Sequence, residues 1–147
     1  MSAIPMEIAT VRQRLLAASV RARTRAQERR ARHDAAGRAY LDFLARIASP
    51  LLRQIAAALK AEGRHFTVFT PGDGLKLALD SSRDDYVEFA LDTSGDAATV
   101  VLRVSQTRGS RTLLEEQHIR MGAAPEDLTD EEVLAALLTA MEPWLER

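Results

Sequence analysis

The residues with the clearest chemical potential in this sequence are arginines spaced along one helical stretch. At about 100° per residue, they fall on two stripes of a helix. One stripe is Arg14, Arg21, Arg25 and Arg32, and the other is Arg12, Arg23 and Arg30. A guanidinium group can bind a carboxylate or a phosphate in two-point fashion. The pattern predicts a surface for an anionic partner, with these contact residues: Arg14, Arg21, Arg25, Arg29, Arg30 and Arg32.

Motifs for catalysis or metal binding are weak. The absence of cysteine excludes disulfides, zinc–thiolate sites and cysteine nucleophiles. The three histidines (His33, His65 and His118) lack metal-ligand spacing, and Glu115 would face away from His118 on a strand. The glycine-rich segment 71–74 is followed by a strand pattern, so it predicts a hairpin turn and not a phosphate loop. We predict a non-enzymatic protein with no catalytic residues, no metal site and no cofactor.

The arginines lie within residues 8–62, which consist mostly of strong helix formers. Apolar residues three and four positions apart form a stripe between the two arginine stripes. This heptad-like pattern predicts a coiled-coil seam for self-association as a homodimer. The seam residues are Ile8, Val11, Leu15, Ala18, Ala22, Leu41 and Leu44.

A helix over the whole stretch would be about 80 Å long. A compact chain of this size has a radius of gyration of only about 15 Å. The helix must therefore break, or pack against another chain. Ser49 before Pro50 predicts an N-cap and a new helix over 50–62, and Gly37 is a second candidate hinge. We predict a long helix that ends near residue 48.

From residue 65 onward, apolar and polar residues alternate, which is typical of strands. A short helix is the alternative for the last predicted strand, because Thr112 and Glu115 resemble a capping box. The polar segment 80–85 lacks the glycine and glutamate of a calcium loop and predicts a solvated turn. Short turns require antiparallel neighbours. The strands are predicted at about 65–70, 75–80, 86–92, 99–105 and 112–121, with the fourth in a central position.

The C-terminal segment predicts a helix over 130–142. Thr129 and Glu132 form a capping box before it, and Pro143 is expected to end or kink it so that Trp144 folds back. With the helix over 50–62 on the same sheet face, the fold class is α+β: a long N-terminal helical arm and a four- or five-stranded antiparallel meander covered by helices. We predict an arm at 1–48 and a two-layer domain at 49–147.

Charge is divided unevenly along the chain. Residues 1–64 hold 13 basic and 5 acidic side chains, a net charge of +8, whereas residues 65–147 hold 7 basic and 16 acidic ones, a net charge of −9. Such asymmetry predicts an anionic partner for the arm. No apolar run is long enough to span a membrane, and no secretory signal pattern is present, so we expect a cytoplasmic protein.

Three functional hypotheses follow. The arginines could flank a coiled coil and pair with acidic residues of the other helix, or they could grip an acidic protein surface, including that of another copy. Alternatively, they could bind nucleic-acid phosphates with weak sequence specificity. An anionic membrane surface is a lesser option because the seam is rich in alanine. We favour an adaptor, regulatory or structural subunit that self-associates and contacts an acidic partner.

Overall fold

The computed structural model describes residues 4–72 and 74–146 and confirms the α+β class. The chain forms two compact units, Met1–Ala35 and Ala36–Arg147. Helix α1 (Ile8–Phe43) begins in the first unit and supplies its last turns to the second. Near the end of this helix, Tyr40 and Phe43 belong to the core of the second unit.

The helical stretch does not break before Ser49 and Ser49 is not its N-cap, although an α-helix does begin again at this residue, close to the predicted restart at Pro50. After α1 come a π-helical turn (Leu44–Ala48) and then α2 (Ser49–Ala61), and the backbone stays helical throughout. The N–H of Ser49 donates to the carbonyl of Leu44, five residues back, and its side chain forms no cap. The wider turn accommodates Pro50, which lacks an N–H and would clash with a regular preceding turn. The proposed hinge at Gly37 lies inside α1.

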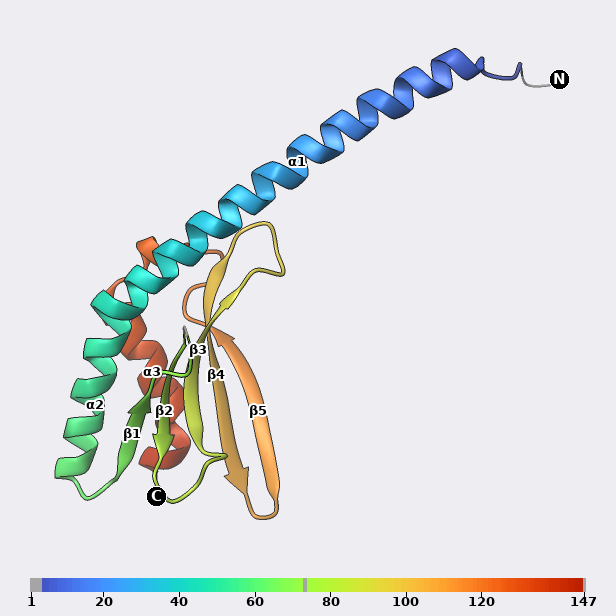
Figure 1. Ribbon diagram of the computed structural model, residues 1–147. Coiled ribbons are helices and arrows are strands. Elements are labelled where there is room, and N and C mark those ends of the chain that lie inside the picture. Colours follow the sequence, from blue (N-terminus) through green and yellow to red (C-terminus); the bar gives the residue numbers. More distant parts are fainter. Residues whose placement is uncertain (1–3, 73, 147) are drawn as a thin grey trace. The chain divides into compact units, whose positions relative to one another are not determined.

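The five strands form one antiparallel meander in sequence order (Figure 1). The ambiguous segment near 112–121 is a strand, although it ends earlier than predicted. The fourth strand is second from one edge, so the third is the central one. The predicted turn at 71–74 is closed by the N–H of Gly74 donating to the carbonyl of Pro71 at 2.9 Å, and Asp73 lies outside the described residues. The strands are β1 (Phe66–Phe69), β2 (Leu75–Leu79), β3 (Tyr86–Asp92), β4 (Thr99–Arg108) and β5 (Arg111–His118).

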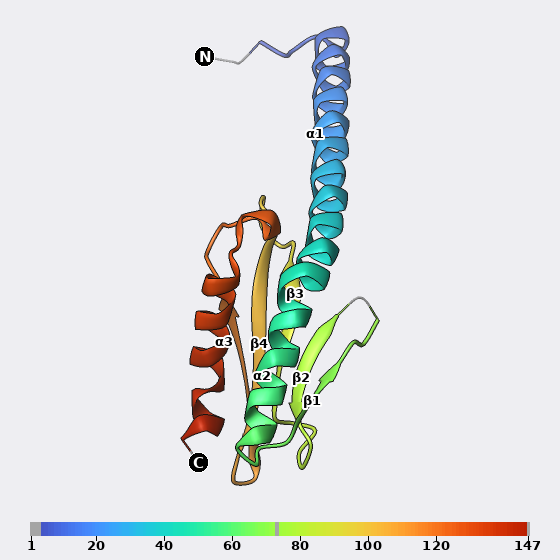
Figure 2. The same cartoon turned by 90° about the vertical axis from the view of Figure 1, so that its left-hand side faces the viewer.

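Helices α2 and α3 (Asp130–Leu145) cover the same face of the sheet, as predicted (Figure 2). Helix α2 contacts β1 and β2, and α3 contacts β3 and β4. The alternating residues of the strands supply the other half of the core. Side chains that are almost completely buried between the two layers include Leu52, Leu77, Phe89, Leu102, Leu137 and Met141.

Helix α3 continues past Pro143 to Leu145, so this proline does not end the helix, which was one of the two predicted outcomes. A proline inside a helix costs about 3 kcal/mol. Trp144, on the next position, is 4% exposed and packs edge-on against Phe66, with ring centroids 6.0 Å apart. Its indole Nε1 donates to Asp85 Oδ1 at 2.9 Å. These contacts favour the helical position of the tryptophan and offset the cost of the proline.

Asp85 is therefore not part of a solvated turn, as the sequence had suggested. It is 2% exposed, and its Oδ1 also accepts the backbone N–H of Thr107 at 3.1 Å. One carboxylate thus joins the turn before β3, the end of β4 and the C-terminal helix. Burial opposes ionisation of the group, but hydrogen bonds from Ser82, Trp144 and Thr107 outweigh it and lower the pKa of Asp85.

Replacing Asp85 with alanine is expected to lower the free energy of unfolding by roughly 2–6 kcal/mol, because the buried indole N–H of Trp144 and the half-buried N–H of Thr107 each lose their acceptor at about 1–3 kcal/mol. Chemical denaturation at neutral pH would measure the loss. The neighbouring Asp84→Ala variant is the control: its side chain is exposed, and it should change stability by less than about 0.5 kcal/mol. Equal losses of unfolding free energy in the two variants would contradict the role of Asp85 as a buried hydrogen-bond acceptor.

The lowered pKa of Asp85 also predicts an acid-sensitive fold. An unfolded aspartate titrates near pH 3.9. Because the folded pKa is lower, the stabilising contribution is complete above that value and is lost as the pH falls through the folded pKa. Denaturation of the wild type and of Asp85→Asn between pH 2.5 and 6 should show a constant difference above about pH 5 that shrinks below about pH 4. If the difference in unfolding free energy between the wild type and Asp85→Asn did not change with pH, an ionised Asp85 would be ruled out.

Candidate interaction surfaces

The predicted contact arginines lie on one helix, α1, and all six are exposed. Ion pairs within the described part of the chain are made by Arg46, Arg103 and Arg120. Among the described residues, none involves an arginine between positions 12 and 38. The charge of these guanidinium groups is therefore not neutralised by an ion pair with any residue that the structure describes, and it remains available to an anion.

The seven predicted seam residues divide into two groups. Ile8, Val11 and Leu15 are 79%, 49% and 64% exposed, and Leu41 is 46% exposed. The two seam alanines, at 18 and 22, are also exposed. Leu44 differs, because it is 8% exposed and belongs to the core of the second unit. The seam residues between positions 8 and 22 are therefore exposed. Leu44, in contrast, is buried in the core and cannot contribute to an interface with another chain.

Two apolar residues of α1 escaped the sequence prediction. Leu16 and Val20 are 62% and 61% exposed, which is as open as the seam itself. On a helix they project roughly 100–140° away from Leu15. They are four positions apart but lie off the stripe from Ile8 to Ala22, so the seam prediction did not include them. They widen the apolar surface of the segment beyond a single stripe.

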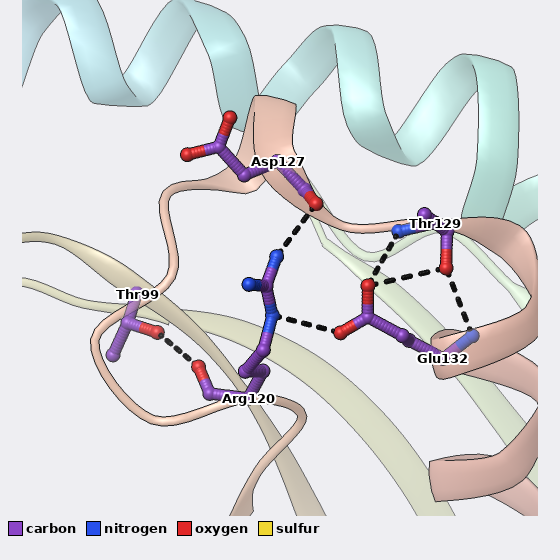
Figure 3. A network of polar contacts seen from close by, with 5 residues as sticks. All are labelled: Thr99, Arg120, Asp127, Thr129 and Glu132. Atoms are coloured by element: carbon purple, nitrogen blue, oxygen red, sulfur yellow. Dashed lines mark hydrogen bonds and ion pairs between the residues drawn. The ribbon is translucent and has the colours of Figure 1, made fainter.

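A polar network at the start of α3 holds the acidic end of the second unit in place (Figure 3). Arg120 pairs with Glu132 through Nε and Oε2 at 2.8 Å and donates from Nη2 to the carbonyl of Asp127 at 2.7 Å. Thr129 and Glu132 form the predicted capping box, with the N–H of Glu132 donating to Thr129 Oγ1 at 3.2 Å. Exposed carboxylates beside this network make an acidic surface: Glu126, Asp127, Asp130 and Glu131.

The second unit also carries several surface pockets, and two of them are adjacent. One, of about 400 Å³, is lined by residues 63–66 and 79–81 together with Trp144. The other, of about 450 Å³, shares Leu79 and Asp80 with it. Asp80 accepts a hydrogen bond from Thr67, and Arg64 donates to the carbonyl of Trp144 at 2.9 Å. These side chains thus stabilise the walls of the pockets. In the described part of the chain, no three potential metal ligands come together.

An arginine that forms an ion pair and one that does not are expected to differ in their contribution to the free energy of unfolding. Arg120→Ala should lower the free energy of unfolding by about 1 kcal/mol, since an ion pair and a hydrogen bond are lost. Arg25→Ala should change it by less than about 0.5 kcal/mol. Thermal denaturation of both variants at one protein concentration checks this. A destabilisation by Arg25→Ala as large as that by Arg120→Ala would show that the α1 arginines serve the fold.

Known proteins offer no guide to these surfaces. No protein-family model matches the chain, and neither the curated proteins nor the solved structures contain a significant match. Among the helices that the structure describes, none has the length and apolar character needed to cross a bilayer.

Proposed function

We propose that this chain is a non-enzymatic interaction module, an adaptor, regulatory or structural subunit, that self-associates through the N-terminal part of α1 and contacts an acidic partner through its arginines. The observation that carries the proposal is the exposure of Ile8, Val11 and Leu15 on one helical stripe. Fully burying such a side chain contributes about 1.5–3 kcal/mol. Three of them in register form a surface that a second helix can cover.

The exposure of the N-terminal segment, residues 4–35, supports the proposal of a helical partner. Every described residue from 4 to 35 is exposed or half-buried, although residues from Ile8 onward are helical. Isolated helices are marginal in water, and most helical stability in proteins comes from packing of an apolar face. Packing against another helix would supply that contribution here.

The arginines favour an acidic protein surface as the second contact. They lack ion-pair partners among the described residues, and a guanidinium matches a carboxylate in two-point fashion. Residues 65–147 carry a net charge of −9, so a second copy is itself a partner of suitable charge. The acidic surface at the start of α3, with four exposed carboxylates between positions 126 and 131, is a candidate for this contact.

Nucleic-acid binding through the same arginines is the second candidate function, and the unpaired guanidinium groups are the observation in its favour. Non-specific binding of single strands commonly adds aromatic stacking to the electrostatic contacts. The aromatic residues nearest to the arginines, Tyr40 and Phe43, are 8% and 2% exposed and lie in the core. The acidic balance of the rest of the chain also opposes a polyanion, so the protein partner is preferred.

Solution mass tests the proposed self-association. Light scattering should give twice the chain mass for the wild type and the monomer mass for Leu15→Asp, because a charge would enter the apolar seam. Gln13→Asp is the matched control: it has a similar helix propensity cost but projects about 160° away from Leu15. Leu44 is unsuitable because it is buried.

The control should keep the dimer mass. An unchanged mass for Leu15→Asp would place self-association elsewhere in the chain. A monomeric wild type would contradict self-association altogether and would turn attention to a foreign anion, with nucleic acid tested next.

A further inference from the structure

We infer that two copies of this chain pair through residues 7–24 as parallel helices in register, an inference that rests on the proposed self-association. The direction of pairing is fixed by the charges that flank the seam. These charges can be placed because α1 is one uninterrupted helix from Ile8 onward and its seam follows a heptad.

The heptad assigns each residue of the segment to a position. Alternating steps of three and four put Ile8, Leu15 and Ala22 at the first core position, a, and Val11 and Ala18 at the second, d. The positions that border the seam are e and g. On this assignment Arg12 and Ser19 occupy e, whereas Arg14 and Arg21 occupy g. Glu7 is the residue just before α1, and its carbonyl accepts the N–H of Val11 at 3.1 Å, which places it at the start of the helix in line with the g positions.

In a parallel pair, each g residue faces the e residue five positions later in the other helix. Glu7 then faces Arg12 of the second copy, and the symmetry repeats this attraction on the other side. The two remaining g residues are arginines, at 14 and 21, and they face the uncharged Ser19 and Ala26. Parallel pairing thus creates two opposite-charge contacts and no like-charge contact along the apolar seam.

In an antiparallel pair, g faces g and e faces e. Two registers place the apolar seam residues of one helix opposite those of the other. The first register places position 15 opposite position 11. Glu7 then faces Arg21, which is attractive, but Arg14 faces Arg14 and Arg12 faces Arg12 of the second copy. Like charges at neighbouring positions are destabilising, so these contacts offset the attraction.

The second antiparallel register places position 15 opposite position 18. Arg14 then faces Arg21 twice, and Glu7 faces Glu28 twice. All of these flanking contacts are repulsive. Both antiparallel registers therefore bring arginines together, and only the parallel register avoids them.

The same heptad indicates where the pairing ends. After Ala22, the next core positions are Arg25, Arg29 and Arg32. In a parallel pair each of these would meet its own equivalent, and a buried unpaired charge is strongly unfavourable. The helices must separate near residue 24. The arginines of both copies then follow directly after the paired segment, where an acidic partner can reach them.

Disulfide trapping tests the direction of pairing, since the chain contains no cysteine of its own. In the parallel pair, Ala18→Cys faces its equivalent and should form a covalent dimer at least tenfold faster than Gln13→Cys, which lies on the opposite side of the helix. The measurement is non-reducing electrophoresis over time under mild oxidation, together with light scattering of each reduced variant.

Mixtures of two variants detect the antiparallel registers. One mixture combines Ile8→Cys with Ala18→Cys, and the other combines Val11→Cys with Ala22→Cys. Each pair of sites is about 15 Å apart along the axis of a parallel dimer, too far for a disulfide. Peptide mass spectrometry should therefore find only links between identical sites. Mixed links would show antiparallel pairing and overturn the inference.

The outcomes separate this inference from the proposed function. A dimeric wild type whose Ala18→Cys variant links no faster than Gln13→Cys would overturn the parallel register and leave self-association standing. A monomeric wild type would overturn both. The cysteine sites are exposed, so loss of folding does not obscure the result, and the mass of each reduced variant verifies that it still associates.

Discussion

A single stripe runs along α1 and into the π-helical turn that follows it, with exposed apolar residues near its start and buried ones at its end. Tyr40 and Leu44 lie on that stripe and are 8% exposed, where they join Phe43 in the core of the second unit. Leu15 lies on the same stripe, within about 20° on an ideal helix, and is 64% exposed. The helix thus has one apolar pattern and two environments. The second unit buries part of the stripe in its core, and the remaining part, from Ile8 to Leu15, is exposed.

The second unit is stabilised by contacts between residues far apart in the sequence. Asp85 and Trp144 are the clearest case, because the carboxylate lies in a turn and the indole at the end of the last helix. Their hydrogen bond explains both the burial of an acidic residue and the passage of α3 through Pro143. It also makes the fold dependent on an ionised group. Local propensity alone would have exposed that aspartate and ended that helix.

This contrast indicates what the sequence could and could not predict. The meander, α3 and its capping box depend on neighbours a few residues apart, and alternation or spacing reveals them. The π-helical turn before Pro50, the burial of Leu44 and the role of Asp85 depend on tertiary packing, which periodicity does not encode. The exposure of Leu16 and Val20 was missed for the opposite reason: they break the heptad, and their importance arises only because nothing in the described chain covers them.

The proposed self-association and the proposed contact with an acidic partner are physically distinct, but both involve the arginines that follow the seam. Apolar burial favours association without specifying direction, and the flanking charges select among the possible registers. Because alanine fills two of the five seam positions before Arg25, the buried area is small and the pairing should be reversible. Arginines that end the seam would repel their equivalents in a second copy. An acidic partner bound there would reduce this repulsion, so partner binding and self-association would reinforce each other by the same factor.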